Sequence, residues 1–380
     1  MQDSMDITVE GNETGNETGK LGFGLMRLPR KGVKIDVEQV SQMVDAFLDA
    51  GFTYFDTARI YPGSEAATRK ALVKRHPRDS FTIATKMNTM IAPTARMAKK
   101  QFETSCKNLG VNYVDHYLLH NLMSKTYRSY DKLGMWDYVR DLKREGKVRQ
   151  FGFSFHAGPE LLDQILTEHP DVDFVQLQIN YADWENPRIT SRANYEVARA
   201  HGKPIVVMEP VKGGALAKPA AEIRALMDDV SPGASYASWA IRFVAGLDGI
   251  LTVLSGMSDL AQVRDNVSYM RDYHPLDERE LAVIGKAREI LGAARDIPCT
   301  SCGYCMEGCP RHIHIPDVFA AMNKKLVAGQ LEQARQDYRE AVRAGNFASA
   351  CIACGKCEDV CPQHIDIIAQ LRECASALEV

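Results

Sequence analysis

Eight short apolar segments, each followed by an amphipathic segment with helical spacing, make up most of the chain and restrict its fold more than any other feature. The apolar segments are at residues 21–28, 53–56, 81–86, 114–120, 148–154, 174–180, 204–209 and 249–255. Each predicts a short strand, and the apolar residues between them recur on one helix face. Eight strand-helix units are the content of one (β/α)8 TIM barrel, an α/β fold. A doubly wound open sheet is the alternative, but no Gly-x-Gly-x-x-Gly motif follows any of these strands.

The last part of the chain departs from this alternation and predicts a second domain. A further helix is expected at 278–291, and two clusters of cysteines follow residue 296. A chain of 380 residues is long enough for more than one domain. We therefore predict a polar N-terminal segment at 1–20, the barrel at 21–275, a linker helix at 276–295 and a second domain at 296–380.

The balance of charge and hydrophobicity argues against two classes of partner. The formal net charge is −3 and charged residues make up 25% of the chain, so no basic field indicates nucleic acid. The apolar runs are too short to span a bilayer, and the acidic N-terminal segment lacks the features of a secretory signal. We expect a cytoplasmic protein with neither nucleic-acid nor membrane partners.

Three consecutive predicted strands end in an ionisable side chain. Asp56, Lys86 and His120 each follow an apolar run directly, and Tyr61 lies in the loop after Asp56. The C-terminal strand ends of a (β/α)8 barrel converge on one mouth, where its chemistry is done. Each residue alone fits a loop cap or an ion pair equally well. Together on neighbouring strands, they predict an active site.

The four residue types suit proton transfer to a carbonyl oxygen. A tyrosine has a pKa of about 10 unless a nearby cation stabilises its anion. Lys86 would be that cation, and Asp56 would neutralise and orient the lysine. Tyr61 could then act as a general acid, while His120 would hydrogen-bond the same oxygen.

The surrounding motifs resemble those of the aldo-keto reductase family. They are Phe-Asp-Thr-Ala-Arg-Ile-Tyr-Pro-Gly-Ser-Glu, Ile-Ala-Thr-Lys and Tyr-Leu-Leu-His, in which Asp56, Tyr61, Lys86 and His120 fall on the catalytic tetrad of that family. The resemblance implies reduction of a small carbonyl substrate with hydride from NADP or NAD. Related enzymes that reduce carbon-carbon double bonds carry Glu at the histidine position, so His120 favours a carbonyl or alcohol substrate.

The same resemblance assigns the cofactor contacts. Ser154 and Gln176 would hold the nicotinamide carboxamide, although Phe155 replaces the usual asparagine, and Met208 stands where many relatives stack a tyrosine. The remaining assigned positions are Gly24, Met26, Gly214, Ser255, Gly256, Met257, Gln262 and Asn266. NADP-specific relatives often place cations in the last segment, whereas this chain has only Arg264 nearby, which leaves the choice between NADP and NAD open. Plain strand packing and a polar helix surface are the alternative for these positions.

Two cysteine runs of identical spacing predict two [4Fe-4S] clusters. Cys-x2-Cys-x2-Cys-x3-Cys-Pro begins at Cys299 and again at Cys351, and in such runs the fourth cysteine ligates the other cluster. The predicted ligand sets are Cys299, Cys302, Cys305 and Cys361 for one cluster, and Cys351, Cys354, Cys357 and Cys309 for the other. Zinc is the alternative, but its structural sites usually pair two short Cys-x-x-Cys arms. We predict a small ferredoxin-like α+β domain, which also follows the barrel in some members of the family.

The cofactors expected in the two domains transfer different numbers of electrons, so we consider three functions for the chain. Nicotinamide transfers hydride, clusters transfer single electrons, and a flavin usually converts between them, yet no flavin motif is recognisable. In the preferred reading the barrel is an NAD(P)H-dependent carbonyl reductase, and the clusters stabilise the fold or bind a redox protein partner. In the second, the clusters carry electrons from an external donor to a flavin or substrate in the barrel. In the third, the barrel is a nicotinamide-binding regulatory subunit.

Overall fold

Eight parallel strands close into a barrel, as predicted. The computed structural model describes residues 19–342 and 345–379, so most of the predicted N-terminal segment lies outside the described residues. The order around the barrel is β1-β10-β9-β8-β7-β6-β5-β4. The strands are β1 (Leu21–Gly24), β4 (Tyr54–Asp56), β5 (Thr82–Met87), β6 (Val114–Leu122), β7 (Val148–Phe155), β8 (Phe174–Gln178), β9 (Ile205–Met208) and β10 (Ile250–Ser255).

The barrel has an inner layer of side chains and an outer layer shared with the helices. The inner layer consists of Tyr54, Ala84, Leu118, Phe174, Val206 and Leu254, all buried. Alternate strand residues point outward and join one large apolar core with the surrounding helices. The strands read as nearly continuous apolar runs because both of their faces are buried.

Ten helices follow the strands and surround the barrel in the described part of the chain. They are α1 (Val37–Asp49), α2 (Ser64–Thr68), α3 (Ala95–Leu109), α4 (Tyr127–Lys132), α5 (Met135–Arg144), α6 (Pro159–Glu168), α7 (Ser191–Ala200), α8 (Ala221–Val230), α9 (Tyr236–Ala245) and α10 (Leu260–Met270). Side chains cap the N-termini of several, for example Asp36 at α1 and Thr94 at α3. The helix expected at 64–76 continues from α2 as a π-helical turn, Arg69–Val73. The short hairpin β2 (Arg30–Lys31) and β3 (Lys34–Ile35) and helix α4 were not predicted.

Helix α11 (Glu278–Ala293), in the predicted linker region, packs onto the barrel. A capping box formed by Asp277 and Glu280 starts it. Its buried residues Val283, Ile284 and Ala287 belong to the same apolar core as the barrel strands and helices. The helix therefore packs in the outer helical layer of the barrel before the chain enters the second domain.

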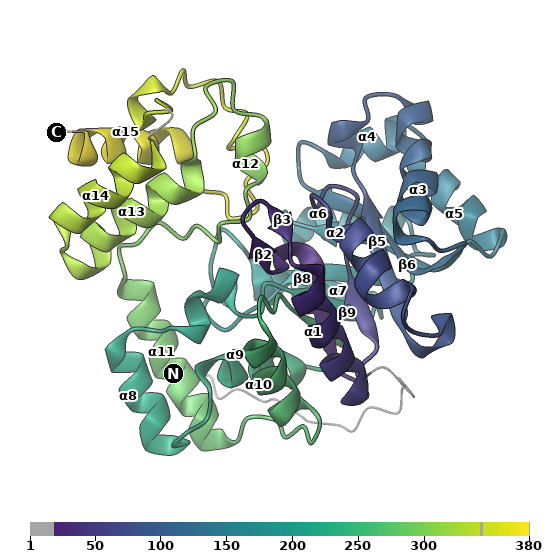
Figure 1. Ribbon diagram of the computed structural model, residues 1–380, viewed down its shortest axis with the longest axis horizontal. Coiled ribbons are helices and arrows are strands. Elements are labelled where there is room, and N and C mark those ends of the chain that lie inside the picture. Colours follow the sequence, from purple (N-terminus) through teal and green to yellow (C-terminus); the bar gives the residue numbers. More distant parts are fainter. Residues whose placement is uncertain (1–18, 343–344, 380) are drawn as a thin grey trace.

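The second domain is a group of helices beside the barrel with its own apolar core (Figure 1). Its helices are α12 (Tyr304–Glu307), α13 (Ile315–Ala328), α14 (Leu331–Ala341) and α15 (Ile367–Leu378). Within its described residues the structure has helices and turns but no strand, so the strands expected of an α+β domain are not found there.

Left-handed residues explain why the cysteine runs form no strand. Ser301 and Gly303 have φ of 54° and 80°, and Ala353 and Gly355, at the equivalent positions of the second run, have 54° and 78°. A backbone that turns left-handed at every second residue cannot maintain a β-ladder. The two runs thus have matching backbone conformations as well as matching spacing. Separately, no helix in the described ranges is long and apolar enough to cross a membrane.

Candidate active site

The strand register brings the predicted tetrad to the C-terminal mouth of the barrel. Asp56 pairs with Ala84 at the end of β4, and Lys86 pairs with Leu118 near the end of β5. Beyond Asp56 the chain keeps bonding to β5, because the Thr57 and Arg59 N–H groups donate to the Ala84 and Lys86 carbonyls at 2.9 and 3.1 Å. This extension ends in the turn that carries Tyr61.

Asp56 and Lys86 form a buried ion pair beneath Tyr61. The Lys86 ammonium group donates to Asp56 Oδ1 and, at 2.9 Å, to the Thr57 carbonyl, and Lys86 is 0% exposed. Its Nζ atom lies 5.5 Å from the centre of the Tyr61 ring. Burial lowers the pKa of Lys86 and raises that of Asp56, and the attraction between the two opposes both shifts. The ammonium group is thus held behind the Tyr61 ring, within the range of a cation–π interaction.

Tyr61 and His120 face each other across the mouth. Their ring centroids are 5.8 Å apart with the ring planes at 82°. Burial lowers the pKa of His120 well below its ordinary value, with Lys86 and His156 adding to the effect. At neutral pH the imidazole is therefore uncharged, with one ring nitrogen able to donate and the other able to accept a hydrogen bond.

The pKa of Tyr61 differs from our expectation. We expected Lys86 to lower it, but burial raises the Tyr61 pKa well above 10, and the neighbouring Tyr304 and Asp56 raise it further. Burial outweighs any effect of Lys86, whose ammonium group is paired with Asp56. Tyr61 is thus a neutral phenol that can donate a hydrogen bond.

A large cavity of about 850 Å³ connects the tetrad with the predicted cofactor segments. This size is within the range of ligand sites in proteins. Asp56, Tyr61 and His120 line one end of it, whereas Lys86 lies behind its wall. Of the predicted cofactor contacts, all but Ser154 line it: Gly24, Met26, Gln176, Met208, Gly214, Ser255, Gly256, Met257, Gln262 and Asn266.

Unpaired polar atoms next to the tetrad fit a bound carboxamide. Gln176 donates to the Met208 sulfur at 3.5 Å, but its buried Oε1 makes no hydrogen bond within the described residues. Ser154 accepts the Asn121 N–H at 2.7 Å and keeps its hydroxyl hydrogen available for donation. A bound group with an N–H donor, such as the nicotinamide carboxamide, would satisfy the Gln176 oxygen.

The other end of the cavity lies at the start of α10. There Gln262 bonds to Ser258 N–H and to Asp259, and Asn266 donates to Ser255 at 2.6 Å, so both amides already have local partners. Two cationic side chains line the cavity within the described part of the chain, Arg27 and Lys218. These two were not predicted.

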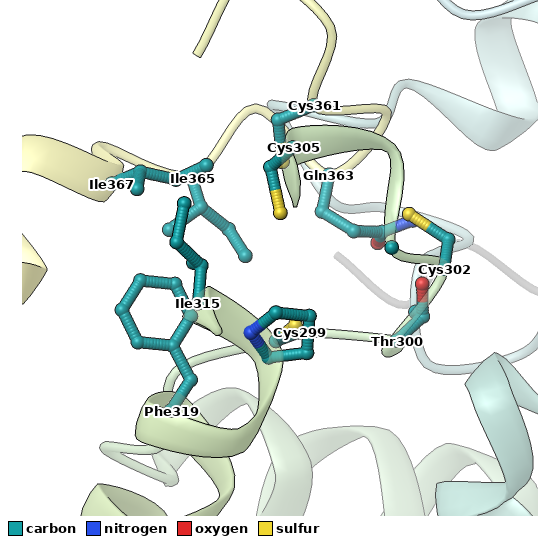
Figure 2. A pocket seen from close by; sticks show the side chains of 12 residues that line it. Cys299, Thr300, Cys302, Cys305, Ile315, Phe319, Cys361, Gln363, Ile365 and Ile367 are labelled. Carbon is teal, nitrogen blue, oxygen red and sulfur yellow. The ribbon is translucent and has the colours of Figure 1, made fainter. Parts of the chain in front are cut away.

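Four of the eight motif cysteines surround one small cavity. Cys299, Cys302, Cys305 and Cys361 line it together with Ile315, Phe319 and Ile365 (Figure 2). This is the predicted first ligand set, including the cysteine contributed by the second run. Burial raises the pKa of all four thiols, and coordination by iron would take the place of their protons.

The other four cysteines line a second cavity of the same kind. They are Cys309, Cys351, Cys354 and Cys357, and Ile315 borders both cavities. Among the residues that the structure describes, no three His, Cys, Asp or Glu side chains converge closely enough to hold a single metal ion. Thiols arranged around an interior space fit a cluster of several iron atoms.

The second domain covers the mouth of the barrel. Gln178 and Gln363 exchange two hydrogen bonds, at 3.2 and 2.9 Å, and both are buried. Arg27 donates to the Thr300 carbonyl at 2.6 Å. Additional pairs join Lys125 to Asp359 and Arg188 to Asp366. The wall of the cavity is therefore built from residues of both domains.

Four of the described residues of the second domain line the active-site cavity: Cys302, Tyr304, Pro362 and Gln363. The sequence predicted Cys302 only as a cluster ligand and did not predict the other three. The Tyr304 hydroxyl and His120 Nε2 are hydrogen-bonded at 3.3 Å, and Tyr304 also hydrogen-bonds Tyr61. The sequence places Tyr304 between two predicted ligands, Cys302 and Cys305. This position between two ligands is the only sequence signal for Tyr304, and it does not indicate a contact with the barrel.

Comparisons with known proteins agree with the two-part architecture. The aldo/keto reductase family model matches residues 20–289, and the 4Fe-4S dicluster domain model matches residues 298–366. Aldo-keto reductase str7 of Strobilurus tenacellus is 31% identical over 211 residues, covering 52% of this chain and 59% of that protein. An oxidoreductase of Bacillus subtilis, YrpG, is 27% identical over 56% of this chain and 68% of its own length. The chain spans about half the length of the first curated relatives it matches.

Solved structures of aldo-keto reductases share the fold. Aldo-keto reductase AKR11C1 from Bacillus halodurans has a TM-score of 0.57 at 23% identity, covering 70% of this chain and 91% of that one. An aldo/keto reductase from Klebsiella pneumoniae, solved with NADP and acetate, has a TM-score of 0.57 at 20% identity, covering 70% and 90%.

Proposed function

Because the chain belongs to the aldo/keto reductase family, we propose that it reduces aldehyde or ketone carbonyl groups with hydride from NAD(P)H. One observation carries this proposal. Asp56, Tyr61 and His120 line a single cavity of about 850 Å³ together with all the cofactor positions that the sequence resemblance assigned except Ser154. Lys86 supports Tyr61 from the buried side.

Each tetrad residue has a role that follows from its surroundings. Tyr61, a neutral phenol in this site, donates its proton to the carbonyl oxygen as that oxygen gains negative charge. His120 hydrogen-bonds the same oxygen through Nε2, the nitrogen that faces the cavity side chain of Tyr304. Lys86 lies behind the Tyr61 ring, with its Nζ atom 5.5 Å from the ring centre, and Asp56 keeps that lysine in place.

The nicotinamide cofactor supplies hydride when bound. Gln176 and Ser154 would hold its carboxamide, and Met208, which contacts Gln176, would border the ring. The similar Klebsiella protein holds NADP and acetate, a nucleotide together with a small oxygen-bearing ligand. Arg27 and Lys218 are the cations available to the phosphates, and Arg27 packs beside Gly256.

The cysteines of the second domain would hold two [4Fe-4S] clusters, which accept and donate single electrons. The two cavities support this assignment because each is lined by three cysteines of one run and the fourth cysteine of the other. We place the domain boundary after α11, since that helix packs with the barrel.

A second candidate function is that of an electron-transfer reductase supplied by a one-electron donor protein. One observation favours it: Cys302, a proposed ligand, lines the same cavity as Tyr61 and His120. Substrate reduction by a chemically reduced viologen in the absence of any nicotinamide would support this second function. Turnover that requires NAD(P)H and does not occur with the reduced viologen would support the first function, carbonyl reduction with NAD(P)H.

A substitution of Tyr61 tests the proposed function. Anaerobically purified enzyme should oxidise NADH or NADPH in the presence of a mixed panel of aldehydes and ketones. Tyr61→Phe should lower kcat by about a hundredfold to ten-thousandfold while cofactor binding persists, because only the proton donor is lost. Tyr138→Phe, on the outer face of the barrel, is the matched control. Unchanged turnover in Tyr61→Phe would contradict the proposal.

A further inference from the structure

Tyr304 enters the active site from the second domain. It begins helix α12, and its side chain lines the cavity with Tyr61 and His120. The His120 and Tyr304 rings are 6.1 Å apart between centroids with planes at 84°, similar to the arrangement of His120 and Tyr61. The imidazole thus has one phenol ring on each of two sides.

The Tyr304 hydroxyl has the partners that a substrate oxygen would have. It is hydrogen-bonded to His120 Nε2 at 3.3 Å and to the Tyr61 hydroxyl. These are the two groups that the proposed mechanism assigns to the carbonyl oxygen. A carbonyl oxygen that bonds to His120 Nε2 and Tyr61 would compete with the Tyr304 hydroxyl for both groups.

We propose that Tyr304 is a gate of the active site, whose hydroxyl holds the substrate-oxygen position and must be displaced before a carbonyl compound binds. The inference rests on the proposed function in its assignment of Tyr61 and His120 to the substrate oxygen. It adds that the second domain selects for ligands that can replace these two hydrogen bonds.

The position of the gate is set by the cysteine run that carries it. Tyr304 lies between Cys302 and Cys305, both of which line the first cysteine cavity. Gly303, directly before Tyr304, has φ of 80°, a conformation that glycine adopts without strain. On the barrel side, Arg27 holds the Thr300 carbonyl at 2.6 Å. Displacement of Tyr304 therefore moves a segment anchored at both ends.

Binding of acetate to the holoenzyme tests the gate without relying on turnover. Acetate affinity would be measured by calorimetry on the cluster-loaded enzyme with its nicotinamide cofactor bound. Tyr304→Phe keeps the ring but removes the competing hydroxyl, so acetate should bind about tenfold more tightly, the factor expected for one net hydrogen bond. Tyr113→Phe, which alters a phenol on the barrel exterior that bonds to Arg149, should bind acetate like the wild type. Iron content and cluster absorbance report whether each variant is loaded.

A second measurement uses the unmodified enzyme. Acetate should increase hydrogen-deuterium exchange in residues 299–305, because that segment must move when Tyr304 is displaced. Equal acetate affinity in wild type and Tyr304→Phe, or weaker binding in the variant, would overturn the gate, since weaker binding means that the hydroxyl assists the ligand. If Tyr61→Phe retains full turnover while Tyr304→Phe tightens acetate binding, the proposed function fails and the gate stands. If Tyr61→Phe is inactive and acetate affinity is unchanged in Tyr304→Phe, the gate fails and the function stands.

Discussion

At the scale of single residues, His116 shows how burial inside the barrel changes the pKa of an ionisable group. It lies on β6 inside the barrel, with its ring centroid 4.9 Å from that of Tyr54 and 5.1 Å from that of Phe174. Burial lowers its pKa to about 4, against opposing effects from Asp115, Gln150 and Asp173. The folded protein therefore holds this histidine in its neutral form.

The lowered pKa of His116 predicts a specific loss of stability in acid. The unfolded chain binds the proton at about pH 6.5 and the folded chain only near pH 4, so stability is fully present above 6.5 and falls between these values. The cost at pH 5 relative to pH 7 is about 2 kcal/mol. His116→Leu should remove this part of the pH dependence, measured by denaturant unfolding followed by tryptophan fluorescence.

The chain provides both a fluorescent reporter and a control position for this experiment. All three tryptophans, Trp136, Trp184 and Trp239, lie in the barrel, so their fluorescence reports barrel unfolding and not the second domain. His274→Leu, at an exposed position, controls for the loss of a histidine. If His116→Leu loses as much stability between pH 7 and pH 5 as the wild type, His116 is not held neutral.

At the scale of elements, the 3₁₀ turn after β9, Lys212–Ala217, lies against the second domain. Gly213 in this turn has φ of 64°, and a Cβ atom there would lie 2.7 Å from the Thr300 carbonyl oxygen. A side chain at this position would therefore clash with the backbone of the first cysteine run. The Gly-Gly of this motif allows the second domain to approach the mouth closely.

Gly213→Ala should weaken the docking of the second domain. The expected result is increased hydrogen-deuterium exchange in residues 299–304, because the new Cβ pushes Thr300 away from the mouth. Gly202→Ala is a matched control, since Gly202 has nearly the same φ, 65°, with nothing within 4 Å of the added Cβ. Both variants share the backbone cost of about 1–2 kcal/mol for a left-handed alanine. Equal exchange of 299–304 in the two variants would show that strain, and not the clash, is responsible.

Local patterns in the sequence predicted the barrel and the placement of its tetrad. The eight strands were predictable because each is a short apolar run, and Asp56, Lys86 and His120 could be placed because parallel strands end at one mouth. The hairpin at 30–35 was missed because its strands are two residues long and exposed. Left-handed residues such as Ser301 and Ala353 prevent a strand within the cysteine runs, and the cysteine spacing does not show them.

The part of the site that comes from the second domain could not be predicted. Tyr304 bonds to His120, which is 184 positions away in the chain, and Gln363 bonds to Gln178, which is 185 positions away. No local periodicity encodes which faces of two domains meet. Nor could the raised pKa of Tyr61 be predicted, because it depends on Tyr304 and on how deeply the site is buried.

At the scale of the whole molecule, the two cysteine cavities lie side by side with Ile315 bordering both, and the first opens toward the barrel through Cys302. The crossed ligand sets tie the beginning of the second domain to its end. Each proposed cluster would therefore link segments about fifty residues apart and hold the domain together.

Single cysteine substitutions should reveal these crossed ligand sets. Cys361→Ser should disturb the cluster of Cys299, Cys302 and Cys305 and leave the other, so that bound iron falls to about half. Cys374→Ala, in the same domain but outside both sets, is the control and should keep all its iron. Electron paramagnetic resonance of the reduced protein would identify the cluster that remains. If Cys361→Ser instead disturbs the cluster of Cys351, Cys354 and Cys357, the crossed assignment is wrong.

The central claim is that hydride passes from nicotinamide to a carbonyl carbon beside Tyr61, and isotopic labelling tests it most directly. NADH or NADPH deuterated at C4 would be incubated with the holoenzyme and a ketone in ordinary water, and the alcohol analysed by mass spectrometry. We expect deuterium on the carbinol carbon when the label is on the transferred face of the cofactor. Carbon-bound hydrogen derived from water with cofactor labelled on either face would contradict direct hydride transfer and favour electrons delivered one at a time.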